Sequence, residues 1–393
     1  MNMAMQNNHI VHVFFGQARK LSPLMAELQS LAGTFRQTLI IPEYDQDPEY
    51  LARRLPSVEI VFLRMRSRHW SARQTPLPKL FRFTEFCLRG MRAARRSDAD
   101  LIVAHDMPAV LPLLGRLLLH PSRVLFNAHE MWTETAENIA PLRPLWRPLE
   151  RWTMRRAGRV ICPEPNRARI FHEEYGTPQP PAVVMNIPAD PPPFERTNAL
   201  RERLSLDDNT VIVLYQGLIA ESRCVRELQH AVLSLPEHVH LVLIGIGEDA
   251  YMQQLREDAR AASNRIHVFP WMNAEDLQRY TFSADVGVLL YRNRGRNNYF
   301  AAPNKLFEYL FAGLPVVSSS FPGLRSIVEK KDGYGACADP ERPEDIARAI
   351  QEAVATSPGA AIAHRARTAW SWGAQSDILH RVYHQAIENA HAH

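Results

Sequence analysis

Two runs of alternating short β-rich segments and longer amphipathic segments divide this 393-residue chain. Alternation of this kind is typical of a parallel sheet whose strands are joined by crossover helices. The expected strands cover 10–16, 38–42, 58–64, 100–105, 123–129 and 159–163 in the first run, and 210–217, 239–245, 265–270, 286–291 and 314–320 in the second. The sequence therefore predicts an α/β protein with two doubly wound, Rossmann-like domains.

A proline-dense segment, 186–198, separates the two runs and suits an extended linker. We accordingly expect a first domain over 1–190 and a second over 191–369. A helix is expected over 366–390. Helices in this position of two-domain proteins often return to the first domain, so 370–393 is assigned there.

Composition favours a globular chain, with 46% hydrophobic and 22% charged residues. The apolar runs are of strand length, far short of the roughly 20 residues that a membrane-spanning helix needs. The amino terminus, MNMAMQNNHIVHVFFG, lacks the basic leader and apolar stretch of a signal peptide. These features predict a cytoplasmic protein.

The segment PNKLFEYLFAGLPVVSSS, 303–320, predicts a helix that begins near Pro303 or Asn304 and ends at Gly313. Free N–H groups at a helix start attract anions such as a diphosphate, and Lys305 lies at the same end. Glu308, in the second turn, is placed to accept hydrogen bonds from ribose hydroxyls. The alternative is an ordinary amphipathic helix with a solvated Lys305 and Glu308.

Gly217 closes an expected strand, and Arg223 stands at the entrance of the next helix. A glycine at this point lets a ligand approach the backbone, and the forked guanidinium of Arg223 suits a pyrophosphate. Gly245 and Gly247 form a weaker glycine signal of the same kind. A tight turn and a surface arginine are the alternative interpretation.

Two segments of the first half, VAHDMP and FNAHEMWTE, place a histidine and an acid after a strand. Ligands bind beyond the carboxyl ends of the strands in open parallel sheets, so His105, Asp106, His129 and Glu130 are aimed at a binding cleft. A histidine beside an acid can do acid–base work or orient a sugar hydroxyl. Structural hydrogen bonding is the alternative.

Asp98-Ala99-Asp100 has the spelling of a metal-binding Asp-x-Asp motif, but it precedes a strand at the end opposite the cleft. We therefore predict a helix-to-strand turn there, and neither a metal nor another cofactor.

The region from Arg53 to Arg96 holds twelve basic and two acidic residues, although the formal net charge is only +4. Its helix, expected over 77–96, mixes phenylalanines with arginines, and 140–159 mixes tryptophans with arginines. Such segments suit peripheral contact with an anionic membrane. An ordinary helix with inward aromatics is the alternative, and the absence of a recognised motif argues against nucleic acid as the partner.

The segments AHDMPAVLPL, NAHEMWTE, YQGLIAESR, GIGE and AAPNKLFEYLFAGLPVVSS resemble those of the retaining GT-B glycosyltransferases of family 4. The resemblance implies two Rossmann-like domains facing a central cleft. It places His129 near the donor sugar, Arg223 at the diphosphate and Glu308 at the ribose. It also implies that the donor is contacted by Gly16 with its turn, by 297–304 and by 267–271, which includes Phe269.

Two positions depart from the family pattern. Phe300 stands where many members carry a second glutamate, and Leu218 where many carry an arginine. The expected contact to the donor sugar is therefore replaced or absent, which leaves the sugar undefined.

The resemblance implies metal-independent transfer, with retention, of a hexose-type sugar from a nucleotide-diphosphate donor to a lipid-linked saccharide in surface or exopolysaccharide biosynthesis. The alternatives are a soluble small-molecule acceptor, a nucleotide-sugar epimerase of the same fold, or a non-catalytic nucleotide-binding partner.

Overall fold

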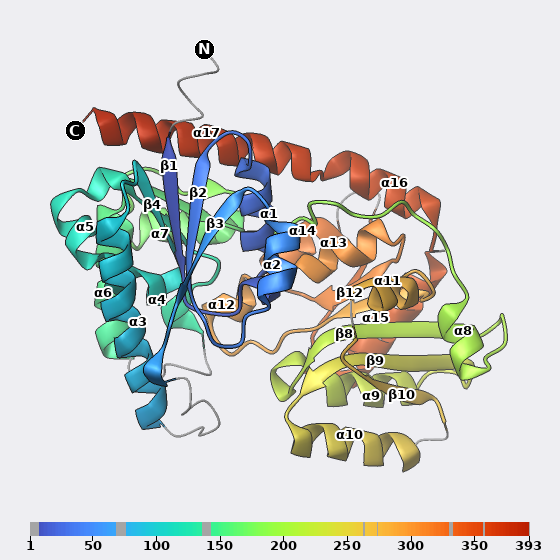
Figure 1. The fold of residues 1–393 in the computed structure, drawn as a ribbon. Helices are drawn as coiled ribbons and strands as arrows, with labels where there is room; N and C mark the ends of the chain where they lie inside the picture. Colours follow the sequence, from blue (N-terminus) through green and yellow to red (C-terminus); the bar gives the residue numbers. More distant parts are fainter. Residues whose placement is uncertain are drawn as a thin grey trace. The chain divides into compact units, whose positions relative to one another are not determined.

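The computed structural model describes residues 8–67, 76–135, 143–261, 264–272, 274–329, 333–356 and 358–392. The chain forms two compact units, each a parallel sheet covered by helices (Figure 1). Unit 1 consists of Met1–Ala189 with Trp372–His393, and unit 2 of Asp190–Ser371.

The sheet of unit 1 has seven strands in the order β3-β2-β1-β4-β5-β6-β7, all paired in parallel. These strands are β1 (His9–Phe14), β2 (Arg36–Pro42), β3 (Val58–Leu63), β4 (Leu101–His105), β5 (Val124–Asn127), β6 (Arg159–Cys162) and β7 (Ala182–Val183). The helices are α1 (Ser22–Leu31), α2 (Pro48–Arg54), α3 (Pro76–Arg96), α4 (Asp106–Val110), α5 (Leu114–Leu119), α6 (Arg143–Arg156), α7 (Pro165–Glu173) and α17 (Trp372–His391).

Helix α17 belongs to unit 1 although it comes last in the chain. Its Val382 and Tyr383 pack into one buried cluster with Ile10 of β1 and Val103 of β4. The hydroxyl of its Ser376 lies 2.6 Å from that of Ser30 in α1. The returning helix therefore closes one face of the first sheet.

The sheet of unit 2 has six strands in the order β10-β9-β8-β11-β12-β13, also paired in parallel. The strands are β8 (Val211–Ile219), β9 (Val239–Gly247), β10 (Ile266–Pro270), β11 (Val286–Leu289), β12 (Val316–Ser319) and β13 (Gly335–Ala338). The helices are α8 (Ala199–Leu204), α9 (Val225–Leu233), α10 (Asp249–Ala261), α11 (Ala274–Thr281), α12 (Arg296–Tyr299), α13 (Asn304–Phe311), α14 (Pro322–Val328), α15 (Pro343–Ala355) and α16 (Ala360–Ala369).

Every expected strand is present, with ends shifted by at most two residues. The turn expected around Asp98–Asp100 is confirmed, because α3 ends at Arg96 and β4 begins at Leu101. Two strands run two residues beyond their expected ends, because β8 continues through Gly217 to Ile219 and β9 continues to Gly247. Strands β7 and β13 were not foreseen.

The single helix expected over 366–390 was also wrong, because the chain forms two helices, α16 and α17. Trp370 between them is extended, with φ −134° and ψ 122°. Its ring packs against Phe307, with centroids 5.7 Å apart, and against Tyr334, at 5.3 Å. These contacts hold Trp370 outside helical geometry.

Among the described helices, none combines the length and the hydropathy that a membrane span requires. The basic region expected between Arg53 and Arg96 is covered in part, because 68–75 lies outside the described residues. The same holds for 140–142 at the start of the second basic region.

Candidate functional site

Two glycines of unit 2 face each other on neighbouring strands, Gly217 on β8 and Gly245 on β9. Gly217 has φ +114°, and a Cβ atom there would lie 1.9 Å from Nζ of Lys305. A Cβ atom on Gly245 would lie 1.8 Å from the carbonyl oxygen of Gly217. The absence of a side chain at Gly217 thus makes room for the amine of Lys305, and its absence at Gly245 makes room for the backbone of Gly217.

Lys305 and Glu308 lie in the first two turns of α13, which Asn304 begins and an extended Pro303 precedes. Burial lowers the pKa of Lys305 to about 8; Arg223 adds to this lowering and Glu308 opposes it. Burial raises the pKa of Glu308, and Lys305 opposes that rise. The start of α13 therefore presents a cation and a carboxylate close together.

Gln216 holds Glu308 in place, which the sequence did not predict. Its Nε2 donates to Oε2 of Glu308 at 2.8 Å, and its Oε1 accepts from the hydroxyl of Thr281 at 2.8 Å. Its backbone N–H donates to the hydroxyl of Tyr309 at 3.0 Å. The only signal in the sequence was its position next to Gly217 in a strand.

Arg223 ends a short 3-10 turn, Glu221–Arg223, that precedes α9. Its guanidinium lies over the ring of Tyr291, 4.3 Å from the centroid, an arrangement in which a cation is attracted to the aromatic face. Phe269, on β10, stacks on Tyr280 with centroids 6.1 Å apart. Arg223 is thus oriented by an aromatic ring, and Phe269 belongs to a separate aromatic pair.

In unit 1, three histidines form a line at the carboxyl ends of adjacent strands β1, β4 and β5. Nδ1 of His12 lies 3.1 Å from Nε2 of His105, and Nδ1 of His105 lies 3.0 Å from Nε2 of His129. All three are buried, and burial lowers the pKa of His12 to about 3 and that of His129 to about 4. These rings are therefore neutral near pH 7.

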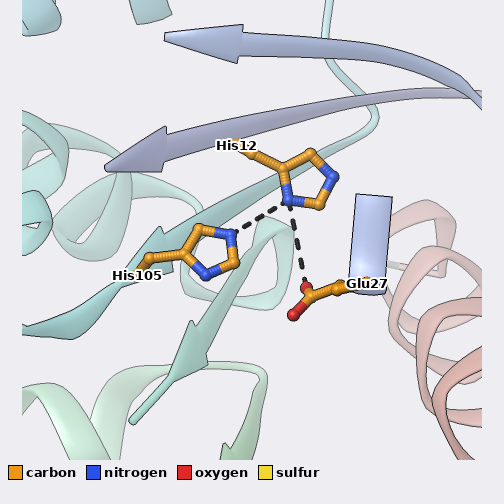
Figure 2. Close-up of side chains that lie close together, drawn as sticks. All are labelled: His12, Glu27 and His105. Carbon is orange, nitrogen blue, oxygen red and sulfur yellow. Dashed lines mark hydrogen bonds and ion pairs between the residues drawn. The ribbon is translucent and has the colours of Figure 1, made fainter. Parts of the chain in front are cut away.

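Glu27 of α1 lies beside this line, as Figure 2 shows, with Oε1 4.0 Å from Nδ1 of His12. Its Oε2 accepts from Asn127 at 2.6 Å, and its Oε1 accepts from the hydroxyl of Tyr383. Burial raises the pKa of Glu27 to about 7. The nearest ligand atoms of His12, Glu27 and His105 lie within 4.8 Å of one another, so this group has the spacing of a metal site.

His12 and Glu27 were missed by the sequence analysis, because each becomes notable only through its neighbours in the folded unit. The expectation of no metal stays a prediction. His129 also lines a small pocket of unit 1, together with Pro23, Glu27, Asn127, Asn186 and Trp372.

Asp106 and Glu130 have structural contacts. Asp106 has φ +60° and accepts from the backbone N–H of Glu130 at 3.1 Å. Burial raises the pKa of Asp106 well above its ordinary value, and Glu130 adds to the rise. Arg167 donates to the carbonyl of His129 at 2.9 Å, and Gln46 donates to that of Gly16 at 2.7 Å. These bonds shape the loops that follow the strands.

Comparison with known proteins gives matches in both units. Residues 15–187 match the family model of the glycosyl transferase 4-like domain, and residues 210–356 match that of the glycosyl transferases group 1. A D-inositol 3-phosphate glycosyltransferase of Xylanimonas cellulosilytica is 27% identical over 219 residues, which are 53% of this chain. This chain spans about half (51%) of the length of that curated relative.

Solved structures share the fold over nearly the whole chain. HepE of Anabaena, in complex with UDP and glucose, superposes with a TM-score of 0.71 at 14% identity, over 96% of this chain and 100% of its own. Sucrose-phosphate synthase of Thermosynechococcus elongatus superposes with a TM-score of 0.73 at 16% identity, over 96% and 98%. The two family models together with this shared architecture show that the chain belongs to the GT-B glycosyltransferases of the family 4 type.

Proposed function

We propose that the protein is a retaining, metal-independent glycosyltransferase that moves a hexose-type sugar from a nucleoside-diphosphate donor to a lipid-linked saccharide. The observation that carries the proposal is the pairing of Lys305 with Glu308 at the start of α13, against Gly217. A partly buried cation at the amino-terminal end of a helix suits a diphosphate, and a carboxylate one turn further suits ribose hydroxyls. The UDP in the HepE complex supports this class of donor.

Each residue then has a task in the transfer. Cleavage of the bond between sugar and diphosphate builds negative charge on the leaving group, which Lys305, Arg223 and the start of α13 stabilise. Glu308 binds the ribose, and His129 hydrogen-bonds a sugar hydroxyl. The leaving phosphate oxygen accepts the proton of the acceptor hydroxyl on the same face, so no side-chain nucleophile is required and the anomeric configuration is retained.

The donor site is tested by a thermal-shift screen against UDP, GDP, ADP, dTDP and CMP. We expect one nucleotide to raise the Tm of the wild-type protein and to have little effect on Glu308→Ala, because binding to the native state alone stabilises it. Glu257→Ala, in an exposed position of α10, is the control and keeps the response. If no nucleotide at millimolar concentration stabilises the wild-type protein, the donor assignment fails.

The reaction class is tested by product analysis with the stabilising nucleotide's sugars. The anomeric configuration of the product, read by NMR, matches that of the donor if the transfer is retaining, and EDTA leaves the rate unchanged if no metal takes part. An altered or free sugar formed without any acceptor indicates an epimerase. Nucleotide binding without turnover indicates a non-catalytic partner.

The proposal of a lipid-linked acceptor is based on a surface of unit 1. Helix α3 carries three exposed apolar side chains among its arginines: Leu80, Phe81 and Leu88, with 60%, 56% and 49% of their surface exposed. The ring of its Phe83 packs near Trp146 of the arginine-rich α6, with ring centroids 6.0 Å apart. Apolar side chains surrounded by arginines suit the boundary of an anionic bilayer. We therefore propose α3 and α6 as the site of membrane contact.

Vesicle flotation tests this assignment. We expect the protein to float with phosphatidylglycerol vesicles and not with phosphatidylcholine vesicles. Leu80→Ser combined with Phe81→Ser reduces flotation, whereas Ile246→Ser, which removes an exposed apolar side chain of unit 2, does not. Absence of binding by the wild-type protein to either vesicle contradicts the proposal.

A soluble acceptor is the second candidate, and the name of the Xylanimonas relative favours it. D-inositol 3-phosphate is a small, soluble, phosphorylated acceptor. Transfer to D-inositol 3-phosphate in the absence of vesicles, at a rate that vesicles do not raise, selects this candidate over the lipid-linked one.

A further inference from the structure

One face of the unit 1 sheet changes from apolar to polar along three adjacent strands. Side chains two positions apart share a face of a strand. On this face Ile10 is followed by His12, Val103 by His105, and Leu125 by Asn127 and then His129. The apolar members pack under α17, and the polar members form a buried row beyond them.

Two hydrogen bonds between ring nitrogens link the three histidines of this row, and each bond contains one proton. A neutral imidazole has one N–H donor and one acceptor nitrogen. The central ring, His105, bonds His12 through Nε2 and His129 through Nδ1, so one of these nitrogens donates and the other accepts. The tautomer of His12 therefore dictates the tautomer of His129. The two hydrogen bonds either both donate toward His129 or both donate toward His12.

Gln37 decides between the directions. Its Nε2 donates to the carbonyl of Leu28 at 3.0 Å, and since a carbonyl only accepts, the orientation of the Gln37 amide is fixed. Oε1 of Gln37 and Nε2 of His12 are both buried without a partner of normal geometry. Gln37 pairs with Ile10 on the neighbouring strand, two positions before His12, so its side chain lies on the same face of the sheet as the His12 ring. Its interaction with the ring raises the pKa of His12 against the larger effect of burial. An N–H on Nε2 of His12 satisfies both.

We propose that this buried chain, which runs from the Leu28 carbonyl through Gln37, His12 and His105, holds His129 as its Nε2–H tautomer and presents the Nδ1 lone pair of His129 to the pocket. With Nε2 of His12 protonated, Nδ1 of His12 accepts from His105, and Nδ1 of His105 accepts from His129. Gln37, His12 and His105 are therefore positioning residues for His129.

The ligand chemistry follows from this tautomer. An unprotonated Nδ1 accepts a hydrogen bond, so the pocket takes a hydroxyl group that donates to His129. Burial lowers the pKa of His129 to about 4, so the ring is neutral and this acceptor is present near pH 6.5. The identification of the hydroxyl with a sugar rests on the proposed function, whereas the tautomer does not.

Besides His105, the described titratable groups that act on His12 are Glu27 from α1, Tyr383 from α17 and, through its charge alone, His9 from the same strand. Both oxygens of Glu27 accept from Asn127 and Tyr383. A carboxylate charge opposite the Nδ1 lone pair of His12 would oppose the chain, but Glu27 is neutral at pH values below about 7. The surroundings of His12 therefore permit the proposed direction.

The tautomer is read directly by long-range proton–nitrogen NMR on the full chain labelled with ¹⁵N-histidine, near pH 6.5. His129 is assigned through loss of its signals in His129→Asn. We expect a protonated Nε2 and an unprotonated Nδ1 on His129. A protonated Nδ1, or the averaged signals of a freely exchanging imidazole, overturns the proposal.

Gln37→Met tests the anchor, because it keeps the length of the side chain and removes its acceptor. We expect averaged tautomers at His129 and a severalfold lower kcat with donor KM little changed. Gln229→Met is the matched control, since Gln229 of unit 2 is also buried and donates to a backbone carbonyl, that of Leu255. Gln37→Met with unaltered His129 signals overturns the proposal.

Two further outcomes are informative. Zinc added to the labelled protein tests whether a metal can replace the proton in the hydrogen bond between Nδ1 of His12 and Nε2 of His105. Unchanged signals support the proposal, and tight binding of zinc there overturns it. If His129 has the expected tautomer but the protein shows no transferase activity, the proposed function fails and this inference stands. If the protein is active but Nδ1 of His129 is protonated, only this inference fails.

Discussion

Gly217 lies where any side chain collides with the amine of Lys305. We predict that Gly217→Ala displaces Lys305 and strains a residue with φ +114°, at a cost of about 1–3 kcal/mol in the free energy of unfolding. Loss of a charge-assisted contact should weaken nucleotide binding about tenfold or more. Gly359→Ala, with φ +151° and nothing within 4 Å of its Cβ position, is the control. Calorimetric titration should show weaker binding in the first variant only.

Lys305 also predicts a pH dependence. Its pKa, lowered by burial to about 8, means that the amine loses its charge as pH rises through that value. We expect the affinity for the stabilising nucleotide to fall severalfold between about pH 7 and pH 9. Lys305→Arg stays charged over this range and should bind without that slope. An identical slope in both proteins would assign the pH effect to another group.

At the level of single residues, the sequence predicted those that follow a recognisable local pattern. Glu308 follows a proline at a helix start, and His129 follows a strand, so their positions along the chain marked them as candidates; their roles stay predictions. Gln216 and His12 sit inside strands, and Glu27 inside a helix. Their importance comes from the side chains that folding brings against them, which no local pattern encodes.

Helix α17 is tied to unit 1 through a buried hydrogen bond. The hydroxyl of Tyr383 donates to Glu27, which is closed off from solvent. Tyr383→Phe removes the hydroxyl that donates to Oε1 of Glu27 and leaves this buried oxygen without that hydrogen bond. We expect a loss of about 1–3 kcal/mol in the free energy of unfolding. Tyr175→Phe, which removes a buried hydroxyl without a partner of normal geometry, should cost clearly less. Urea unfolding of the two variants provides the comparison.

Strands that form continuous apolar runs were predictable from the sequence, and short strands that depend on tertiary pairing were not. Strand β13 reads Gly-Ala-Cys-Ala, and β7 has only two residues, so neither carries a β signal of its own. Both form by pairing at an open edge of an existing sheet. The break between α16 and α17 depends on the rings of Phe307 and Tyr334, which lie far from Trp370 in sequence.

For the whole molecule, we predict a pH dependence of the free energy of unfolding from two buried glutamates. Burial raises the pKa of both Glu27 and Glu150 to about 7 from 4.5. Between these values the folded state binds more protons than the unfolded state, so its stability falls as pH rises from about 4.5 to 7. Glu27→Gln should flatten this slope in chemical unfolding curves recorded across that range. An unchanged slope would mean that Glu27 does not contribute to it.

The division of the chain, with α17 completing unit 1 after all of unit 2, has a consequence for biosynthesis. During translation the strands of the first sheet leave the ribosome early, but the helix that covers their Ile10 and Val103 face emerges only after residue 371. The unit that is synthesised first is therefore the last to be completed. Until then the apolar face of its sheet lacks its cover, while the second unit already has all the residues of its own core.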